Sequence, residues 1–364
     1  MKLVIQIRLL PDAAQSVLLR ETVERTNAAS NWIAGIAFEN KTANVFDLRK
    51  LCYHETRQRF GLSSQQAQLA IKAVSDAYKR DKKIRVSFRT HAAIAYDQRT
   101  MGFKGVDRVS LLTLAGRTVV PFVFGTYQKE RVGAAKGQCD LVLRNDGKWF
   151  LIVTVDVPDG TPIAATDFIG VDLGLNELAT DSDGINHSGA PVEAGRRKHN
   201  LQRKRLQRRG TKGAKKKLKR IAGKESRFRR HTNHIISKKI VGTAKGTGRG
   251  IALEELTHIR ERITARGGDA RSRLGGWAFA QLRAFIEYKA RLAGIPVVLV
   301  DPRNTSRTCN ECGYCDEGNR RSQALFLCKA CGHTANADAN AAKNLRDLAL
   351  GASKPPTELA ALAG

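Results

Sequence analysis

The sequence predicts two parts of different fold class: an N-terminal β domain interrupted by a helical insertion, and a C-terminal α/β part with a mixed sheet covered by helices. The first rests on short β-rich segments separated by Gly, Asp and Asn turns, and the second on strands and helices that alternate after residue 167. Two Cys-x-x-Cys pairs add a small metal-binding segment. With 364 residues, the chain can form two or three domains with a sizeable core.

The N-terminal elements follow from hydrophobic periodicity and turn residues. A strand is predicted over Leu3–Leu10, and helices are predicted over Asp12–Phe38 and Ser63–Tyr78. The segments predicted as further strands of this domain are Ile84–Phe88, Ser110–Leu114, Val119–Phe124, Cys139–Arg144 and Trp149–Val157.

Domain boundaries follow from this order. The β domain comprises residues 1–10 and 82–160, and the helical insertion comprises residues 11–81. Pro158–Pro162 is the predicted linker to the second part. At the other end, Gly351–Gly364 is rich in Ala and Pro and is predicted to be a loosely held, flexible tail.

The second part begins at Asp167 with a strand, a turn and a strand. Basic helices, a strand, a helix, a strand, the cysteine pairs and a last helix over Asp338–Leu348 follow. This alternation predicts a mixed sheet covered by helices.

The positive charge is concentrated in one segment. The chain has 63 Lys and Arg against 34 Asp and Glu, a net charge of +29, yet its hydrophobic fraction of 42% is that of a folded protein. Between Arg196 and Lys239, 20 residues are basic and one, Glu225, is acidic. Apolar residues recur there at loosely helical spacing, which predicts one or two long basic helices with a thin apolar stripe. The alternative is a disordered or solvated basic tract.

A polyanion is the expected partner of excess positive charge on a folded body. We therefore expect the basic segment 196–239 to contact nucleic-acid phosphates. The residues predicted to bind nucleic acid are Arg196, Arg197, Lys198, Arg203, Lys204, Arg205, Arg208, Arg209, Lys215, Lys216, Lys217, Lys219 and Arg220.

The composition excludes several classes of protein. No run of 18 or more apolar residues is present, so no transmembrane helix and no membrane partner are expected. Met1–Ala13 is not a signal peptide, because Gln6 and Arg8 interrupt its apolar run. Of the seven cysteines, five lie within Cys309–Cys331, which is typical of a metal site in a reducing cytosol rather than of a disulfide scaffold.

The cysteine pairs predict one structural zinc ion. Cys309-x-x-Cys312 and Cys328-x-x-Cys331 are separated by 15 residues, a spacing that suits tetrahedral zinc in a ribbon over residues 303–333. Gly313 and Gly332 follow the pairs and suit the tight turns of zinc knuckles. A redox Cys-x-x-Cys would not need a second copy. Cys315 is expected to be a spectator.

Asp172 stands out by its context. It lies in an apolar strand and shares a face with Gly170 and Gly174, so no side chain crowds its carboxylate there. A charge in such a strand is costly unless it is paired or holds a metal.

Two further acidic positions come from later elements. Glu254 and Glu255 both end a short strand, and alternation alone does not choose between them. Asp338 opens a helix whose Ala341 and Ala342 would permit close packing on a sheet. Each acid alone is explained as a strand-end or first-turn charge. Together, in a cation-rich chain, they indicate a two-metal site that acts on phosphodiesters.

Several segments are distinctive in combination. They are Gly170-Val-Asp-Leu-Gly174, Leu253-Glu-Glu-Leu256, Asp301-Pro-x-x-Thr-Ser306 with Cys309-x-x-Cys-Gly313, Asp338-Ala-Asn-Ala-Ala342, and Trp277-x-Phe-x-x-Leu282 with Tyr288-Lys289 and Gly294-Ile-Pro-Val297. This set resembles TnpB, the family of transposon-encoded, RNA-guided DNA endonucleases related to the CRISPR type V effectors. The resemblance is dense over Asp167–Leu348 and only architectural over the first 160 residues.

The resemblance implies an RNase H-like RuvC nuclease domain over 165–302 and 334–350, with the zinc ribbon inserted. It also implies that the N-terminal β domain is a wedge domain and that its helical insertion is a recognition domain. The acids implied to be catalytic, and to hold two Mg²⁺ ions, are Asp172, Glu254 and Asp338.

Two details of the acidic site depend on the resemblance. Glu254 is favoured over Glu255, because the family's glutamate precedes an acidic residue and then Leu. The family often has an acid where this chain has Asn336, and we expect this departure to change local hydrogen bonding rather than remove a ligand.

The implied function is Mg²⁺-dependent hydrolysis of target double-stranded DNA chosen by a guide RNA derived from the transposon end. A monomer in the prokaryotic cytoplasm, associated with the nucleoid, is expected. Three alternatives remain: a nuclease-inactive, RNA-guided regulator; a miniature CRISPR type V effector; and a transposase that itself joins strands. The last is disfavoured, because nothing in this sequence resembles the tyrosine and paired-histidine arrangement of single-strand transposases.

Overall fold

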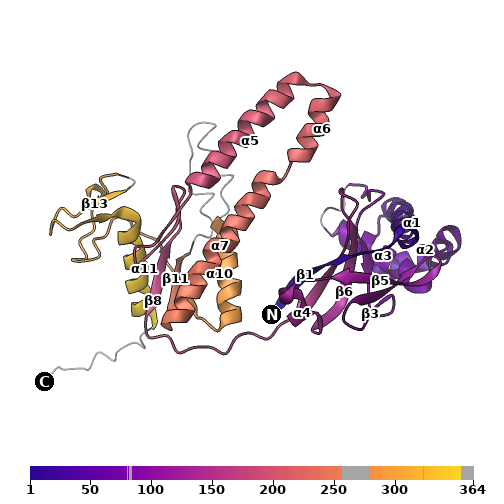
Figure 1. The fold of residues 1–364 in the computed structure, drawn as a ribbon, viewed down its shortest axis with the longest axis horizontal. Coiled ribbons are helices and arrows are strands. Elements are labelled where there is room, and N and C mark those ends of the chain that lie inside the picture. Colours follow the sequence, from indigo (N-terminus) through magenta and orange to yellow (C-terminus); the bar gives the residue numbers. More distant parts are fainter. Residues whose placement is uncertain (80, 82–83, 256–278, 323, 354–364) are drawn as a thin grey trace. The chain divides into compact units, whose positions relative to one another are not determined.

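The computed structural model describes residues 1–79, 81, 84–255, 279–322 and 324–353. The chain divides into unit 1, Met1–Pro158, and unit 2, Asp159–Gly364 (Figure 1). Leu256 and Trp277, which belong to the family-like segments, lie outside the described residues. No helix in the described ranges is long and apolar enough to cross a membrane.

Unit 1 is built on a seven-stranded antiparallel sheet in the order β2-β6-β7-β1-β5-β4-β3. Central β1 pairs with β7 along its whole length, from Lys2 opposite Asp156 to Leu9 opposite Trp149. Ile5, Ile7 and Leu9 are buried because alternate side chains of β1 face the core. The strands are β1 (Lys2–Leu9), β2 (Ile94–Tyr96), β3 (Met101–Lys104), β4 (Arg108–Thr113), β5 (Gly116–Val123), β6 (Ala135–Leu143) and β7 (Trp149–Asp156).

Helices separate β1 from the other strands, as the sequence predicts. α1 begins after a capping box in which Asp12 and Gln15 exchange hydrogen bonds. The second helix was not predicted, because Leu48, Cys52 and Thr56 are its only buried residues and form a weak apolar pattern. The helices of unit 1 are α1 (Ala13–Glu39), α2 (Val45–Phe60), α3 (Ser64–Tyr78) and α4 (Thr126–Val132).

The strand predicted over Ile84–Phe88 is wrong. This segment has no regular secondary structure and pairs with no strand among the described residues. Instead, the side chain of Asn31 in α1 donates from Nδ2 to Phe88 O at 2.9 Å and accepts from Phe88 N at 2.7 Å. Val86 and Phe88 pack on the helical core, so a side chain takes the place of a neighbouring strand.

Unit 2 contains a five-stranded mixed sheet in the order β10-β9-β8-β11-β12. β8, β11 and β12 are parallel, whereas β9 and β10 continue from β8 as antiparallel strands. The strands are β8 (Phe168–Asp172), β9 (Glu177–Asp181), β10 (Asn186–Ser188), β11 (Gly250–Glu254) and β12 (Val297–Val300).

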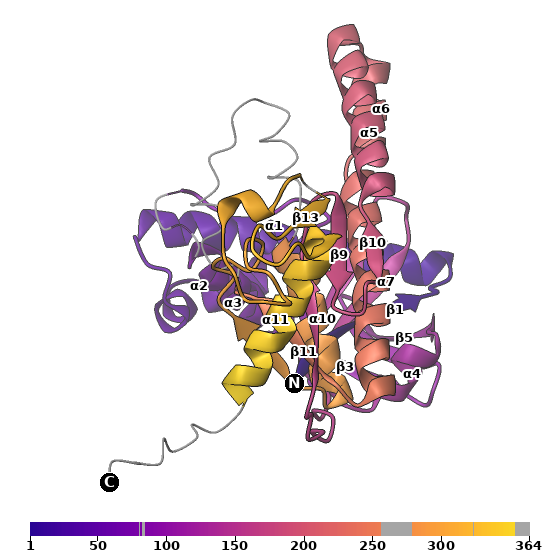
Figure 2. The same ribbon diagram turned by 90° about the vertical axis from the view of Figure 1, so that its left-hand side faces the viewer.

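Helices cover both faces of this sheet. α7 (Lys224–Thr247) and α10 (Phe279–Ala293) lie on one face, and α11 (Ala337–Ser353) lies on the other (Figures 1 and 2). Ile169 and Val171 pack toward α7 and α10, whereas Phe168 packs with Leu345 of α11. α11 ends at Ser353, so residues 351–353 are helical and not part of the predicted tail; the rest of the tail lies outside the described residues.

The basic segment forms a helical arm of unit 2. α5 (Ala190–Arg209) runs away from the sheet, α6 (Lys212–Ile221) reverses the direction, and α7 returns to the sheet (Figure 1). Gly210 caps α5 in the left-handed conformation, with φ of 63°. The alternative of a disordered tract is therefore wrong.

The cysteine pairs lie between β12 and α11. This segment contains the 3₁₀ turn η1 (Glu317–Asn319) and the hairpin of β13 (Leu325–Leu327) with β14 (Thr334–Asn336).

Candidate functional site

Two predicted acids end neighbouring parallel strands. Asp172 is the last residue of β8 and Glu254 is the last residue of β11, and Leu253 lies opposite Val171 in the pairing of the two strands. The carboxyl ends of parallel strands meet at one edge of a sheet, and there the carboxyl groups of Asp172 and Glu254 each shift the pKa of the other.

Asp338 reaches the same edge because α11 lies directly on β8. A Cβ atom at Gly170 would lie 1.9 Å from the carbonyl oxygen of Ala342, so the helix can approach this closely only because residue 170 is glycine. Asp338 is the second residue of α11 and is 6% exposed. The small residues predicted on the faces of β8 and α11 therefore make this contact.

Asn336 caps the helix that carries Asp338. Its Oδ1 accepts hydrogen bonds from the backbone N–H groups of Asp338 at 3.0 Å and Ala339 at 3.1 Å. Asn336 thus has a local hydrogen-bonding role at the N-terminal end of α11.

The three acids are electrostatically strained in the absence of a cation. Burial, and then the charge of Asp338, raises the pKa of Asp172 to about 6. Burial, and then the charge of Asp172, raises the pKa of Glu254 to about 9. Burial also raises the pKa of Asp338, although Arg320 opposes this. Asp338 is buried, whereas Asp172 and Glu254 are half-buried. Enclosed carboxylates with too little compensating charge are a donor set that fits Mg²⁺.

Glu255 lies in a different environment from Glu254. Arg283 of α10 donates to its two carboxylate oxygens, from Nη1 at 2.8 Å and Nη2 at 3.1 Å. Glu254 and Glu255 thus point to different sides of the sheet edge, one toward Asp172 and the other toward α10.

Arg320 is a site residue that sequence reasoning missed. Arg320 lies in the cysteine-rich segment, and its Nη2 donates to Asp338 Oδ1 at 3.0 Å. Its charge lowers the pKa of both Asp172 and Glu254. The three acids are more widely spaced than the ligands of a compact metal site. In the described residues, only the four paired cysteines bring three or more possible metal-ligating atoms within 4.8 Å of one another. No signal in the sequence marks Arg320, because it depends on a contact between separate elements.

The four predicted zinc ligands are gathered as a tetrahedral site requires. Their sulfur atoms all lie within 4.8 Å of one another, and Sγ of Cys309 lies 3.7 Å from Sγ of Cys331. Sγ of Cys312 lies 3.6 Å from Sγ of Cys328. Four sulfurs at about 2.3 Å from zinc would be about 3.8 Å apart, so the cluster fits zinc.

The turns after the cysteine pairs require glycine. Gly313 and Gly332 have φ of 74° and 71°, the left-handed region that the sequence led us to expect there. Cys315 is exposed and lies outside the four-sulfur cluster.

The cysteine-rich segment is attached to α11 by side-chain hydrogen bonds. Asn310 N donates to Asn340 Oδ1 at 3.1 Å, and Nδ2 of Asn344 donates to the carbonyl oxygens of Thr305 and Thr308 at 2.7 and 2.8 Å. This attachment links the four-sulfur cluster to the helix that carries Asp338.

The helical arm exposes most of the residues predicted to contact nucleic acid. Arg196 is the exception: it is 6% exposed, and its guanidinium donates to both carboxylate oxygens of Glu193 at 2.8 Å. Its side chain supports the base of α5, so the prediction that Arg196 contacts phosphates is wrong. Arg197 also pairs with Glu193 but is exposed, and the other eleven predicted residues are exposed. Outside 196–239, unit 2 has 18 basic and 19 acidic residues, so the arm carries its entire net charge.

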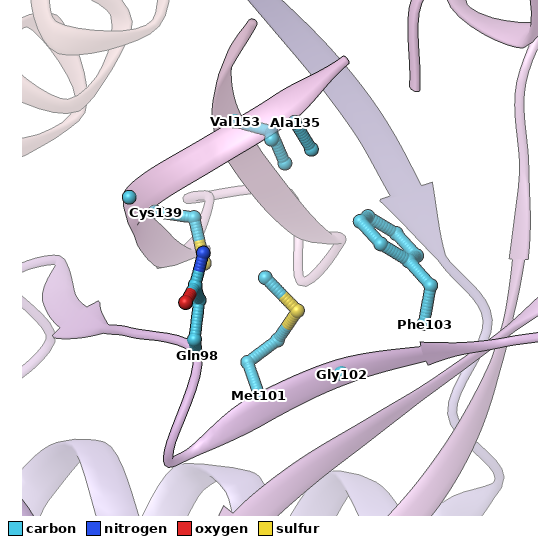
Figure 3. A pocket seen from close by; sticks show the side chains of 8 residues that line it. Gln98, Met101, Gly102, Phe103, Ala135, Cys139 and Val153 are labelled. Atoms are coloured by element: carbon cyan, nitrogen blue, oxygen red, sulfur yellow. The ribbon is translucent and has the colours of Figure 1, made fainter. Parts of the chain in front are cut away.

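A cavity of about 130 Å³ lies in unit 1 between β3 and the strands β6 and β7 (Figure 3). Met101, Phe103 and Val153 make its lining apolar, with the amide of Gln98 at one side. Burial raises the pKa of Cys139 in this lining to about 12, so its thiol is protonated at neutral pH and is not a nucleophile. Cys52 in α2 is likewise a buried free thiol, and burial raises its pKa.

Comparison with known proteins confirms the family resemblance. Residues 151–257 match the family OrfB_IS605, described as a probable transposase, and residues 279–345 match the Cas12f1-like TNB domain. A CRISPR-associated endodeoxyribonuclease Cas12f1 of Sulfoacidibacillus thermotolerans is 35% identical over 252 residues, which are 64% of this chain and 56% of that protein. A TnpB-like protein of Methanocaldococcus jannaschii is 35% identical over 128 residues, which are 35% of this chain and 45% of that protein.

The fold also has a solved counterpart. The Cas12f1 chain of a cryo-EM complex with sgRNA and target DNA covers 90% of this chain, which in turn covers 82% of that chain, with a TM-score of 0.61 and 16% identity. The chain spans about half the length of the two curated relatives above. It is therefore related in sequence to TnpB-like and Cas12f1 proteins and shares the mixed α/β fold of the Cas12f1 chain.

Proposed function

We propose that this chain is an RNA-guided DNA endonuclease. The observation that carries the proposal is the convergence of Asp172, Glu254 and Asp338 at one sheet edge, from three elements far apart in the sequence. The positively charged arm of α5, α6 and α7 supplies groups that can bind phosphates, and relatives named as endodeoxyribonucleases support the reaction class.

The three acids would hold two Mg²⁺ ions in a RuvC-like domain over 165–302 and 334–350. Bound Mg²⁺ in such a site activates water and stabilises the leaving 3′-oxygen of a phosphodiester. The protein supplies carboxylates fixed by β8, β11 and α11, so their orientation precedes binding of the ions. Because the pair of Asp172 and Glu254 retains a proton above neutral pH, it must release that proton when it becomes a cation ligand.

Arg320 has a distinct role in this proposal. Its pairing with Asp338 partly neutralises the acids, and a guanidinium there can donate to a phosphate oxygen of an entering strand. The zinc ribbon over 303–333, held by one Zn²⁺, would fix the position of Arg320 and of the N-terminal end of α11.

The nucleic-acid partners would be a guide RNA derived from the transposon end and target double-stranded DNA. Base pairing would choose the target, while the protein contacts backbone phosphates and a short flanking motif. The β wedge domain (1–10 and 82–160) and its recognition insertion (11–81) would share this task. We favour a monomer in the prokaryotic cytoplasm.

A miniature CRISPR type V effector is the second candidate, because the Cas12f1 relative matches more of this chain than the TnpB-like one does. The origin of the guide distinguishes the two. RNA that copurifies with the protein should map to a transposon end for the first function and to a repeat array for the second.

The direct test combines the protein with its copurified RNA and a plasmid library whose target matches the guide beside randomised flanking sequence. Cleavage that requires both the guide and Mg²⁺ is expected. If no member of the library is cut while guided binding is detected, the nuclease-inactive regulator is the better description.

A further inference from the structure

Glu177, the first residue of β9, has a carboxylate oxygen whose burial no hydrogen bond among the described residues explains. Its Oε2 is buried and has no hydrogen-bond partner within the described part of the chain. The hydroxyl Oγ1 of Thr180, a residue that is 1% exposed, is buried and unpartnered in the same sense. Buried polar atoms are usually paired, so two unpaired atoms on one short strand are a place where a ligand or water could complete the hydrogen bonding.

Thr180 lies on the side of the sheet that holds the acidic site. It pairs directly with Asp172 across β8 and β9, and residues directly opposite one another in a sheet share a face. Gly170, two residues before Asp172, contacts α11, so this is the face that α11 covers.

A β-bulge brings Glu177 to the same face. On β10, His187 lies opposite Ala179, but the next residue, Ser188, lies opposite Glu177, so Leu178 is an extra residue in β9. Leu178 and Ala179 both join the core on the α7 and α10 side of the sheet. Alternation therefore restarts at the bulge and returns Glu177 to the α11 side, where strict alternation from Thr180 would have pointed it away.

The charge of Asp338 acts on the carboxyl group of Glu177. Burial, and then that charge, raises the pKa of the Glu177 carboxyl. A further carboxylate beside Asp338 would repel the phosphates of a nucleic acid unless a cation lies between them. A bound cation would thus make the position of this carboxylate favourable.

We propose that Glu177 is a fourth carboxylate of the divalent-cation site, with the Thr180 hydroxyl beside it, and that it binds the cation on the Asp338 side or a water molecule on that cation. The inference rests on the proposed function, because it requires that the other three acids hold the cations.

The test measures Mn²⁺ binding to the full-length, guide-bound protein by electron paramagnetic resonance, together with the Mg²⁺ dependence of cleavage. Glu177→Gln should weaken Mn²⁺ binding about tenfold and raise the Mg²⁺ concentration for half-maximal cleavage by a similar factor. Glu177→Asp keeps the charge on a shorter side chain and should be intermediate. The control is Glu287→Gln on α10, whose carboxylate Arg283 holds at 2.8 Å; it should match the parent.

A thermal melt in EDTA separates ligation from a structural role. Glu177→Gln should be at least as stable as the parent there, because it removes an unpaired carboxylate. Parental Mn²⁺ affinity in Glu177→Gln, or equal destabilisation by Gln and Asp in EDTA, would overturn the inference. Asp172→Asn distinguishes failure of the proposed cation site from failure of the role of Glu177. If Asp172→Asn also leaves Mn²⁺ binding unchanged, the cation site itself is wrong. If Asp172→Asn abolishes binding and Glu177→Gln does not, only the role of Glu177 is wrong.

Discussion

The guanidinium of Arg320 donates a hydrogen bond from Nη2 to Oδ1 of Asp338 across 3.0 Å. The two residues belong to different parts of unit 2, the cysteine-rich segment and α11, so this bond couples the four-sulfur cluster to the acidic edge of the sheet. Asp338 is nearly buried, with its side chain 9% exposed, whereas that of Arg320 is 26% exposed. The arginine can therefore meet an entering phosphate while the acid stays enclosed.

Replacing Arg320 should impair cleavage more than target binding. Arg320→Ala removes a charged donor at the site where phosphate charge changes, and removal of such a donor slows a reaction roughly a hundredfold. Arg320→Lys should recover part of the rate, since charge is kept but the forked geometry is not. Single-turnover cleavage and a filter-binding assay check this. An equal reduction in both assays would instead assign Arg320 to general nucleic-acid binding.

Replacing the titratable carboxyl group of Glu254 with an amide should stabilise the cation-free protein at high pH. The pKa values of Asp172 and Glu254 lie above the value of about 4 of an unfolded carboxyl. The folded state thus binds more protons than the unfolded state, and the stability this provides is complete below about pH 4 and disappears as pH rises through about 6 to 9.

Glu254→Gln should therefore melt at a higher temperature than the parent in EDTA at pH 8, with a smaller difference at pH 5. Added Mg²⁺ should raise the melting temperature of the parent at pH 8 and not that of the variant. A lower melting temperature for the variant in EDTA at pH 8 would contradict the destabilising effect that we assign to this carboxylate.

Disruption of the zinc site should reduce cleavage at a distance. Cys331→Ser removes one of four gathered thiolates, and structural zinc contributes folding free energy directly. Because the segment holds Arg320 and contacts Asn340 and Asn344 of α11, the variant should be less stable and should cleave more slowly. Elemental analysis should find one zinc per parent chain; parent protein purified without chelator and free of zinc would refute the assignment. Cys315→Ser, outside the cluster, should keep both zinc and activity.

The helical arm should determine how RNA binding depends on salt. Replacing Lys215, Lys216 and Lys217 of α6 with Gln should weaken guide binding and reduce the slope of log affinity against log salt. The expected reduction is about 0.7–0.9 for each RNA phosphate that these lysines neutralise in the parent. The contrasting variant is Arg196→Gln. Because Arg196 is buried against Glu193, this substitution should lower the melting temperature and leave the salt slope nearly unchanged. The reverse pattern would show that α6 does not contact the RNA.

Local patterns were sufficient to predict much of this fold. Alternation in β1 and β7, the starts of α1 and α3, and the paired cysteines each arise from residues close in the sequence, and these features were predicted within a few residues. The small residues around Asp172 and Asp338 also predicted the close approach of α11 to β8, which Gly170 makes possible.

Contacts between distant segments set the limit of prediction. Ile84–Phe88 has the composition of a strand, but the side chain of Asn31 in α1 binds the backbone N–H and carbonyl groups of Phe88. Arg196 looks like its basic neighbours, but Glu193 pairs with it. The roles of Arg320 and Glu177 depend on a tertiary ion pair and on a one-residue bulge, and neither has a periodic signal. The choice between Glu254 and Glu255 likewise depends on Arg283, a partner 28 residues away.

The most direct test is guided plasmid cleavage, beside guided target binding, for Asp172→Ala, Glu254→Ala, Asp338→Ala and Glu255→Ala. Each of the first three should cleave at least about a thousandfold more slowly, since each removes a ligand of the cations that act on the scissile phosphate. Target binding should be nearly intact, because it depends on many basic groups and on base pairing. Glu255→Ala, whose carboxylate is turned to Arg283, should still cut. Cleavage by all four variants, or an inactive Glu255→Ala beside an active Glu254→Ala, would contradict the site described above.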